Sequence, residues 1–346
     1  MLLEGLYLPI ATPFYPDGRL NLRKIEHNVD RYSRTPAAGL AVLSDVGEPA
    51  MLSDAETRDA LSAAILLAAD TKVMLAGISR SSVLGTLELA EFAATAGYDA
   101  VLVKRPDATE DRPQELLTYF QAIADRSPLP VVLYSARSAV LPVDAVAALA
   151  THPQIIGIVD EDGAARRIAQ LREATATVSR EVTVTTVFAA VTRRMLAIKE
   201  AAGAATFVSA ESLGGGAAVA TAPPKATIKT RTKGVSFQIV TANSTGMLEG
   251  LRAGAAGAMP AFATSAPQAA YEVYAAWKDG DQPLADAKQS RLTPAIALIE
   301  TELGLAGIRY ASELTGYFGG RPRLPLLPLS GEARERVERV MKGIRN

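Results

Sequence analysis

Eight short apolar runs, separated by longer Ala- and Leu-rich segments, constrain the fold of this chain more than any other feature. They lack the alternation of polar and apolar residues typical of a strand with one face in water, so they predict strands covered on both faces. The segments between them have helical spacing, and Ser53 followed by Glu56 predicts a capping box at the start of one helix. The runs cover residues 5–14, 39–45, 72–79, 100–106, 130–136, 155–161, 237–243 and 257–262.

This alternation of strands and helices is compatible with a closed (β/α)8 TIM barrel and with an open, doubly wound sheet. Periodicity alone does not choose between these two α/β architectures. No G-x-G-x-x-G sequence follows a strand, which weakens the case for a dinucleotide-binding sheet.

Composition excludes several classes of function. The chain has no cysteine and two histidines, which rules out disulfides, thiol nucleophiles, thiolate metal sites and a histidine-rich metal centre. A net charge of −1 provides no strong field for nucleic acid or an anionic membrane. We find no signal peptide and no uncharged apolar run of the roughly 18–20 residues that a membrane span needs. We therefore expect a cytoplasmic globular protein without a bound cofactor or metal.

One stretch, about 179–235, interrupts the alternation. After a helical pattern at 165–175, about sixty residues pass before the next clear barrel strand, where a usual connection takes a handful. Residues 225–234 alternate in polarity and predict an edge strand or hairpin arm protected by lysines. Residues 172–233 contain nine Lys/Arg and four Asp/Glu, which is compatible with an arm that faces an anion or a partner, or with a solubilised edge strand. Because the stretch begins after the sixth helix, we expect it on the N-terminal face of a barrel.

Beyond residue 264 the pattern is helical only. We therefore predict a barrel over 1–263 with an insertion at about 179–235 between the sixth helix and the seventh strand, followed by a C-terminal helical region over 264–346.

Motifs along the chain resemble the dihydrodipicolinate synthase and N-acetylneuraminate lyase family. LPIATPFYPDGRLN at 8–21 is similar to the family's opening strand and turn, and RPRLPLLPLSGEARERV at 321–337 to its closing signature. The resemblance covers the chain except the insertion and implies a barrel, short 2-keto acid substrates such as pyruvate, and a homo-oligomer, either a tetramer or a dimer. Residues 182–186 also lie near the family spacing for the seventh strand, but we assign that strand to 237–243.

The resemblance places a catalytic lysine on the sixth strand, where this chain has Val159. The family lysine forms an imine with the keto carbon of pyruvate, which a valine side chain cannot do. In the loop after the second strand, Asp45 and Val46 replace the family's threonines, while Gly47 and Glu48 are retained. After the fourth strand, Pro106-Asp107-Ala108 replaces the family's tyrosine pair.

Other positions match the family's site. The resemblance implies a proton-transfer role for Tyr134 and a carboxylate-binding role for Arg137, and it places the backbone of Met259 in the keto-acid pocket. The predicted catalytic residues are Tyr134 and Lys104, and the predicted substrate-binding residues are Asp45, Val46, Gly47, Arg137, Val159 and Met259.

Three functions remain open at this point. The first is a family member that binds a small 2-keto acid or related carboxylate, or serves as an assembly subunit, without imine chemistry. The second is an active lyase or aldolase whose amine has moved to Lys104, close to Arg105; Lys199 in the insertion is expected on the opposite face. The third is a metal-dependent enzyme that uses four carboxylates, those of Asp45, Glu48, Asp160 and Glu161.

Overall fold

The computed structural model describes residues 1–197 and 228–344. Eight parallel strands close into a barrel in the order β1-β10-β9-β6-β5-β4-β3-β2, and each of the eight predicted apolar runs contains one of them. The (β/α)8 prediction is therefore confirmed. In chain order the barrel strands are β1 (Gly5–Ile10), β2 (Gly39–Val42), β3 (Val73–Gly77), β4 (Ala100–Lys104), β5 (Val131–Ser135), β6 (Ile155–Asp160), β9 (Gln238–Thr241) and β10 (Gly257–Ala258).

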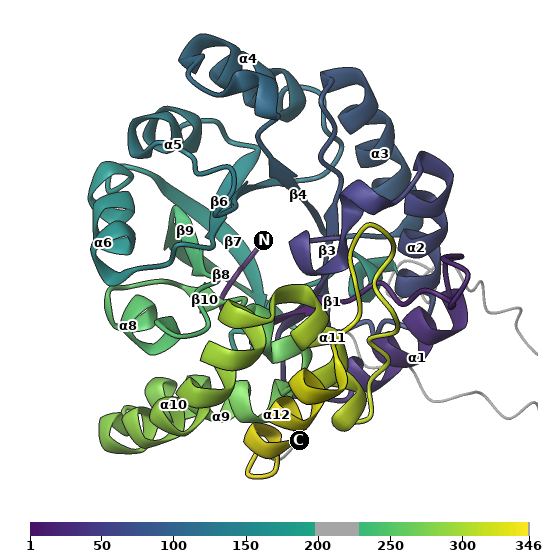
Figure 1. Cartoon of the computed structure of the whole chain (residues 1–346). Coiled ribbons are helices and arrows are strands. Elements are labelled where there is room, and N and C mark those ends of the chain that lie inside the picture. Colours follow the sequence, from purple (N-terminus) through teal and green to yellow (C-terminus); the bar gives the residue numbers. More distant parts are fainter. Residues whose placement is uncertain (198–227, 345–346) are drawn as a thin grey trace, which may run out of the picture.

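Helices surround the barrel (Figure 1). They are α1 (Leu22–Ser33), α2 (Asp54–Leu66), α3 (Val83–Ala96), α4 (Pro113–Ala124), α5 (Val143–Ala150), α6 (Ala165–Ala174), α8 (Met247–Arg252) and α9 (Pro267–Lys278). The chain then continues through α10 (Gln282–Ile296), a π-helical turn η6 (Ala297–Glu302), α11 (Gly304–Leu314) and α12 (Gly331–Met341). The division of the chain at residue 263 stays a prediction. None of the described helices is long and apolar enough to span a membrane.

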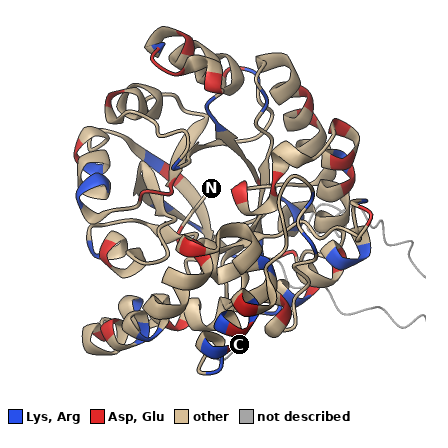
Figure 2. Ribbon diagram, viewed as in Figure 1, with Lys and Arg blue, Asp and Glu red and all other residues tan. Residues whose placement is uncertain are grey.

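Strand alternation separates two parts of the core. On β4, Val101 and Val103 pack in the cluster between strands and helices, whereas Ala100 and Leu102 pack in the cluster inside the barrel. Both faces of the strand are therefore buried, which explains why the runs lack polar alternation. Charged residues of both signs are interspersed on the surrounding helices (Figure 2).

The predicted insertion contains a two-stranded antiparallel sheet of β7 (Ser179–Thr185) and β8 (Thr230–Ser236). Neither strand belongs to the barrel, so β9 is the seventh barrel strand, as predicted. Residues 193–197 are helical. Lys199 lies outside the described residues.

Contacts of this segment place it at the N-terminal end of the barrel, also as expected. Arg180 donates to the carbonyl oxygen of Ile155, the first residue of β6, at 2.6 Å, and Lys233 pairs with Glu4, directly before β1. Arg193 donates its backbone N–H to Asp99, directly before β4. The side-chain cations of Arg180 and Lys233 therefore bind the barrel itself, which accounts for part of the local positive charge without an external anion.

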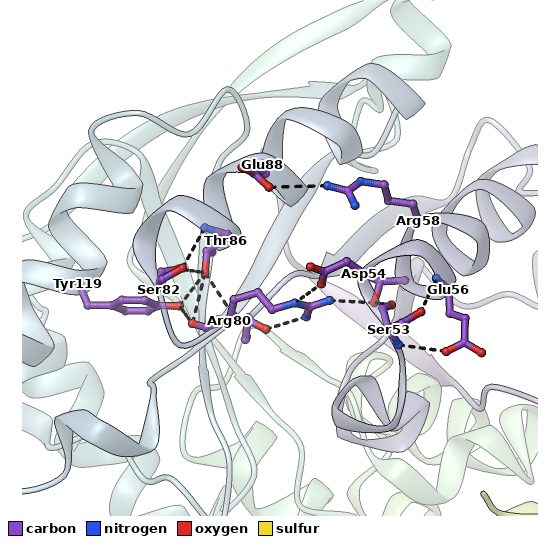
Figure 3. A network of polar contacts seen from close by, with 12 residues as sticks. Ser53, Asp54, Glu56, Arg58, Arg80, Ser82, Thr86, Glu88 and Tyr119 are labelled. Carbon is purple, nitrogen blue, oxygen red and sulfur yellow. Dashed lines mark hydrogen bonds and ion pairs between the residues drawn. The ribbon is translucent and has the colours of Figure 1, made fainter.

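The loop after β3 is held by a polar network at the opposite, C-terminal end (Figure 3). Arg80 donates to Asp54 at 2.9 Å and to Thr57 at 2.8 Å, and the Tyr119 hydroxyl donates to the Arg80 carbonyl oxygen at 2.8 Å. Ser53 and Glu56 form the predicted capping box at the start of α2. The network fixes the rim next to the C-terminal end of β4.

Candidate functional site at the barrel mouth

Adjacent strands bring three of the predicted site residues into one row. Lys104 on β4 is paired with Tyr134 on β5, and Tyr134 is paired with Val159 on β6. Tyr134 and Val159 belong to the cluster inside the barrel. Leu102 belongs to the same cluster, and Lys104 follows it by two residues, so the Lys104 side chain also leaves the strand on the inner side of the barrel. The row lies at the C-terminal strand ends, where barrels of this type carry their sites.

Val159 forms an apolar wall of this site. Its side chain is 1% exposed and packs in the cluster inside the barrel, together with Tyr134 and Met259. The Met259 backbone N–H donates to the Thr241 carbonyl oxygen at 2.8 Å, so it is already paired. The sixth strand thus presents a hydrocarbon surface at the position predicted for the imine-forming amine.

Glu161 is the polar partner of Tyr134. The Tyr134 hydroxyl donates to Oε1 of Glu161 at 2.5 Å, and the Arg137 backbone N–H donates to Oε2 at 2.8 Å. Burial raises the pKa of Glu161, and the nearby Asp45 charge raises that pKa further. Burial, followed by the charges of Glu161 and Asp45, raises the pKa of Tyr134 well above its usual value. The pair can therefore hold a proton on Tyr134 and exchange one at Glu161 at a pH above the usual carboxyl range.

A Glu161→Gln substitution is expected to raise the melting temperature at pH 8 more than at pH 4. A carboxyl whose pKa is raised on folding destabilises the folded state at pH values above the pKa that the group has in the unfolded chain, about 4.3. This destabilisation disappears as the pH falls below that value. Glutamine imitates the protonated form at every pH. Thermal unfolding across this range measures the difference; a gain that does not depend on pH would contradict the raised pKa.

The loop after β2 contributes Asp45, whose partner was not anticipated from the sequence. Lys104 Nζ lies 3.1 Å from Oδ1 and 3.4 Å from Oδ2 of Asp45. The amine predicted as a relocated nucleophile is therefore an ion-pair partner, and it offsets the negative charge expected of Asp45. The Gly47 carbonyl oxygen accepts a hydrogen bond from the Thr12 hydroxyl at 2.7 Å, which ties the loop to the end of β1.

A cavity of about 190 Å3 opens beside these groups. Arg137 lies on the rim of this cavity, and its Nη2 atom is 3.8 Å from Oε1 of Glu300. Glu300 belongs to η6 and also accepts a hydrogen bond from the Phe262 backbone N–H at 3.1 Å. Burial raises the pKa of Glu300. At about 30 Å3 per water, the cavity has the volume of roughly six waters and suits a molecule of a few heavy atoms. Its lining comprises Asp45, Val46, Arg137, Glu161, Ala242, Ala261, Glu300, Gly304, Leu305 and Ile308.

The metal alternative is contradicted by the positions of its carboxylates. The buried Glu48 pairs with Arg309, and Asp160 accepts from Arg167 Nε at 2.8 Å on the outer side of β6. Only Asp45 and Glu161 of the four line the cavity. Among the described residues, no group of three or more His, Asp or Glu side chains could hold a metal ion.

The sequence contains a local signal for the place of Glu161 in the site but none for that of Glu300. Glu161 follows Val159 by two residues, a spacing that places both side chains on one face of a strand. Glu300 comes from the C-terminal region, and no local sequence signal connects it with Arg137.

Comparisons with known proteins agree with this architecture. The model of the dihydrodipicolinate synthetase family matches residues 2–212 and 217–344. A 4-hydroxy-tetrahydrodipicolinate synthase of Acidiphilium cryptum is 25% identical over 346 residues, covering 99% of both chains. One from Xanthomonas campestris is 36% identical over 175 residues, which are 49% of this chain and 58% of that protein.

Solved structures also match across almost the whole chain. The chloride-inhibited dihydrodipicolinate synthase of Acinetobacter baumannii, complexed with pyruvate, has a TM-score of 0.77 at 21% identity and covers 99% of both chains. A dihydrodipicolinate synthase of Bacillus anthracis has a TM-score of 0.77 at 20% identity, with both chains fully covered. At these identities the likeness establishes the fold.

Proposed function

Because the chain belongs to the dihydrodipicolinate synthetase family, we propose that it binds a small 2-keto acid or a related carboxylate non-covalently at the barrel mouth, without the family's lysine-dependent imine chemistry. Val159 carries this proposal. Its buried hydrocarbon side chain lies where the family resemblance places the imine-forming lysine, and it has no lone pair with which to attack a keto carbon.

The charges around the cavity are compatible with a carboxylate ligand. The Asp45 charge is offset by Lys104, and the raised pKa values of Glu161 and Glu300 reduce their negative charge relative to ordinary carboxylates. Arg137 is half exposed and lies 3.8 Å from Glu300, so a ligand carboxylate can compete for its guanidinium group. The Tyr134 hydroxyl donates its single proton to Glu161, so it can donate to a keto oxygen only when Glu161 is protonated.

A second candidate function is an aldolase that uses Lys104 as its amine. The strand register favours it, because Lys104 lies in one hydrogen-bonded row with Tyr134 and Val159. The Asp45 carboxylate opposes it, because its ion pair with the amine, at 3.1 Å, would have to break before the amine could attack a keto carbon. A dimer or tetramer also stays a prediction, which light scattering can measure.

The experiment combines pyruvate binding with borohydride reduction. We expect pyruvate to bind to the wild-type protein in ligand-observed NMR and the intact-protein mass to remain unchanged after reduction. A Lys104→Arg variant keeps the charge beside Asp45 but cannot form an imine, and it should bind pyruvate as the wild type does. An adduct on Lys104 that this variant abolishes would instead establish the second candidate. Absence of pyruvate binding together with absence of an adduct would contradict the keto-acid proposal.

A further inference from the structure

A second cavity, of about 600 Å3, lies on the outer side of the barrel between the segments that follow β4 and β5. We call it the α4–α5 pocket, because it is lined by the loops before these helices and by their first turns. Leu116, Pro142 and Ala145 give it apolar walls. Its charged lining is three arginines and three acidic residues, Arg105, Arg112, Arg137, Glu110, Asp111 and Asp144, of which Arg137 also lines the barrel-mouth cavity. Its volume lies within the roughly 300–1,000 Å3 range of small-molecule sites.

Arg105 points into this pocket. It follows β4 directly, and Val101 and Val103, two and four residues earlier, belong to the cluster between strands and helices, so its side chain leaves on the outer side. The Arg105 Nη2 atom lies 3.4 Å from Oε1 of Glu110, which also lines the pocket, so the head group lies at the pocket rather than at the barrel mouth.

The Arg105 guanidinium is buried without adequate partners. Its side chain is 9% exposed, and Nε and Nη1 have no hydrogen-bond partner among the described residues. The partner of Nη2, Glu110, is 68% exposed, so its charge is screened by solvent. Buried donors of folded proteins are almost always paired, and an unpaired buried one costs free energy that a bound ion or water can recover.

We propose that the α4–α5 pocket binds the oxyanion group of a small organic ligand, a carboxylate or a phosphate ester, through Arg105. The planar guanidinium fork matches two oxygens of such a group, and charge-assisted hydrogen bonds of this kind are the strong ones. A modest turn of the head group away from Glu110 presents its unpaired donors to the ligand. The apolar walls contact the organic part. This proposal does not rest on the proposed barrel-mouth function, because Arg105 faces away from the barrel interior.

The test uses inorganic phosphate and phenyl phosphate at constant ionic strength, with calorimetry and thermal unfolding as readouts. We expect both to bind the wild type and phenyl phosphate to bind more tightly. Arg105→Gln should weaken both at least about tenfold, the loss expected for a charge-assisted hydrogen bond. Arg126→Gln, the matched control at an exposed arginine just after α4 and outside the pocket lining, should change affinity less than about threefold.

Two further results separate binding from a structural role. Without phosphate, Arg105→Gln should melt at the same or a higher temperature than the wild type, because it removes a buried charge with unpaired donors. Phosphate should raise the melting temperature of the wild type more than that of the variant. If Arg105→Gln does not fold, Arg105→Lys, which keeps a charge without the fork, should show an intermediate loss of affinity. A wild type that binds neither probe, or equal affinities in the wild type and the Arg105 variant, would overturn the proposal.

Discussion

A Val159→Lys variant incubated with pyruvate and borohydride is expected to gain the mass of a reduced pyruvate adduct, where the wild type gains none. The substituted position is 1% exposed and lies opposite Tyr134 in the strand register. Burial in this apolar environment lowers the pKa of a lysine, which increases its neutral, nucleophilic fraction. Intact-protein mass spectrometry, followed by peptide mapping to residue 159, measures the result.

A Val159→Met variant provides the matched control, because it fills similar space without an amine. Thermal unfolding of both variants checks that they are folded. A folded Val159→Lys protein that pyruvate leaves unmodified would mean that residue 159 does not occupy the imine position, and the assignment of the barrel mouth would have to be revised.

Replacing Arg309 by methionine is expected to lower the free energy of unfolding by about 3–5 kcal/mol, the range for a buried ion pair that loses one partner. Arg309 and Glu48 are each 2% exposed in their side chains and form a buried pair between α11 and the loop after β2. Arg309 also donates to the carbonyl oxygen of Thr12 at 2.9 Å. Burial lowers the pKa of Arg309 to about 10, yet it stays charged at neutral pH, so its removal leaves a buried carboxylate alone.

Urea unfolding at pH 7 measures this loss. Arg336→Met is the control, because Arg336 pairs with Glu302 on the surface, where both side chains contact solvent, and it should show a small fraction of the effect. Equal losses in the two variants would contradict a special role for the buried pair in attaching the C-terminal helices to the barrel.

The sequence located all eight strands, because both faces of every strand are buried and each therefore appears as a continuous apolar run. It did not by itself choose the closed barrel, which the family resemblance implied. The sequence also distinguished the seventh barrel strand from residues 182–186, of which 182–185 belong to β7 instead. The C-terminal helices were predicted as helices, but their contribution to the site was not. Glu300 reaches Arg137 through tertiary packing of η6, and such packing leaves no periodic trace in the sequence.

The sequence predicted which residues form the candidate site better than it predicted the interactions between them. Tyr134, Asp45 and Lys104 converge as expected of C-terminal strand ends. Which charges would pair was not evident, because Lys104 and Asp45 are 59 residues apart and come from different strands. The proposed metal cluster failed for the same reason: Glu48 and Asp160 lie within two residues of cavity residues in the sequence, but they pair with Arg309 and Arg167.

Carbon-13 NMR of pyruvate labelled at its keto carbon, mixed with the wild-type protein, tests the central claim most directly. We predict a keto-carbon signal that broadens as pyruvate binds, with no imine-carbon signal at any protein concentration. An imine-carbon signal from the wild-type protein would contradict the account, because it would show covalent chemistry without a lysine at position 159.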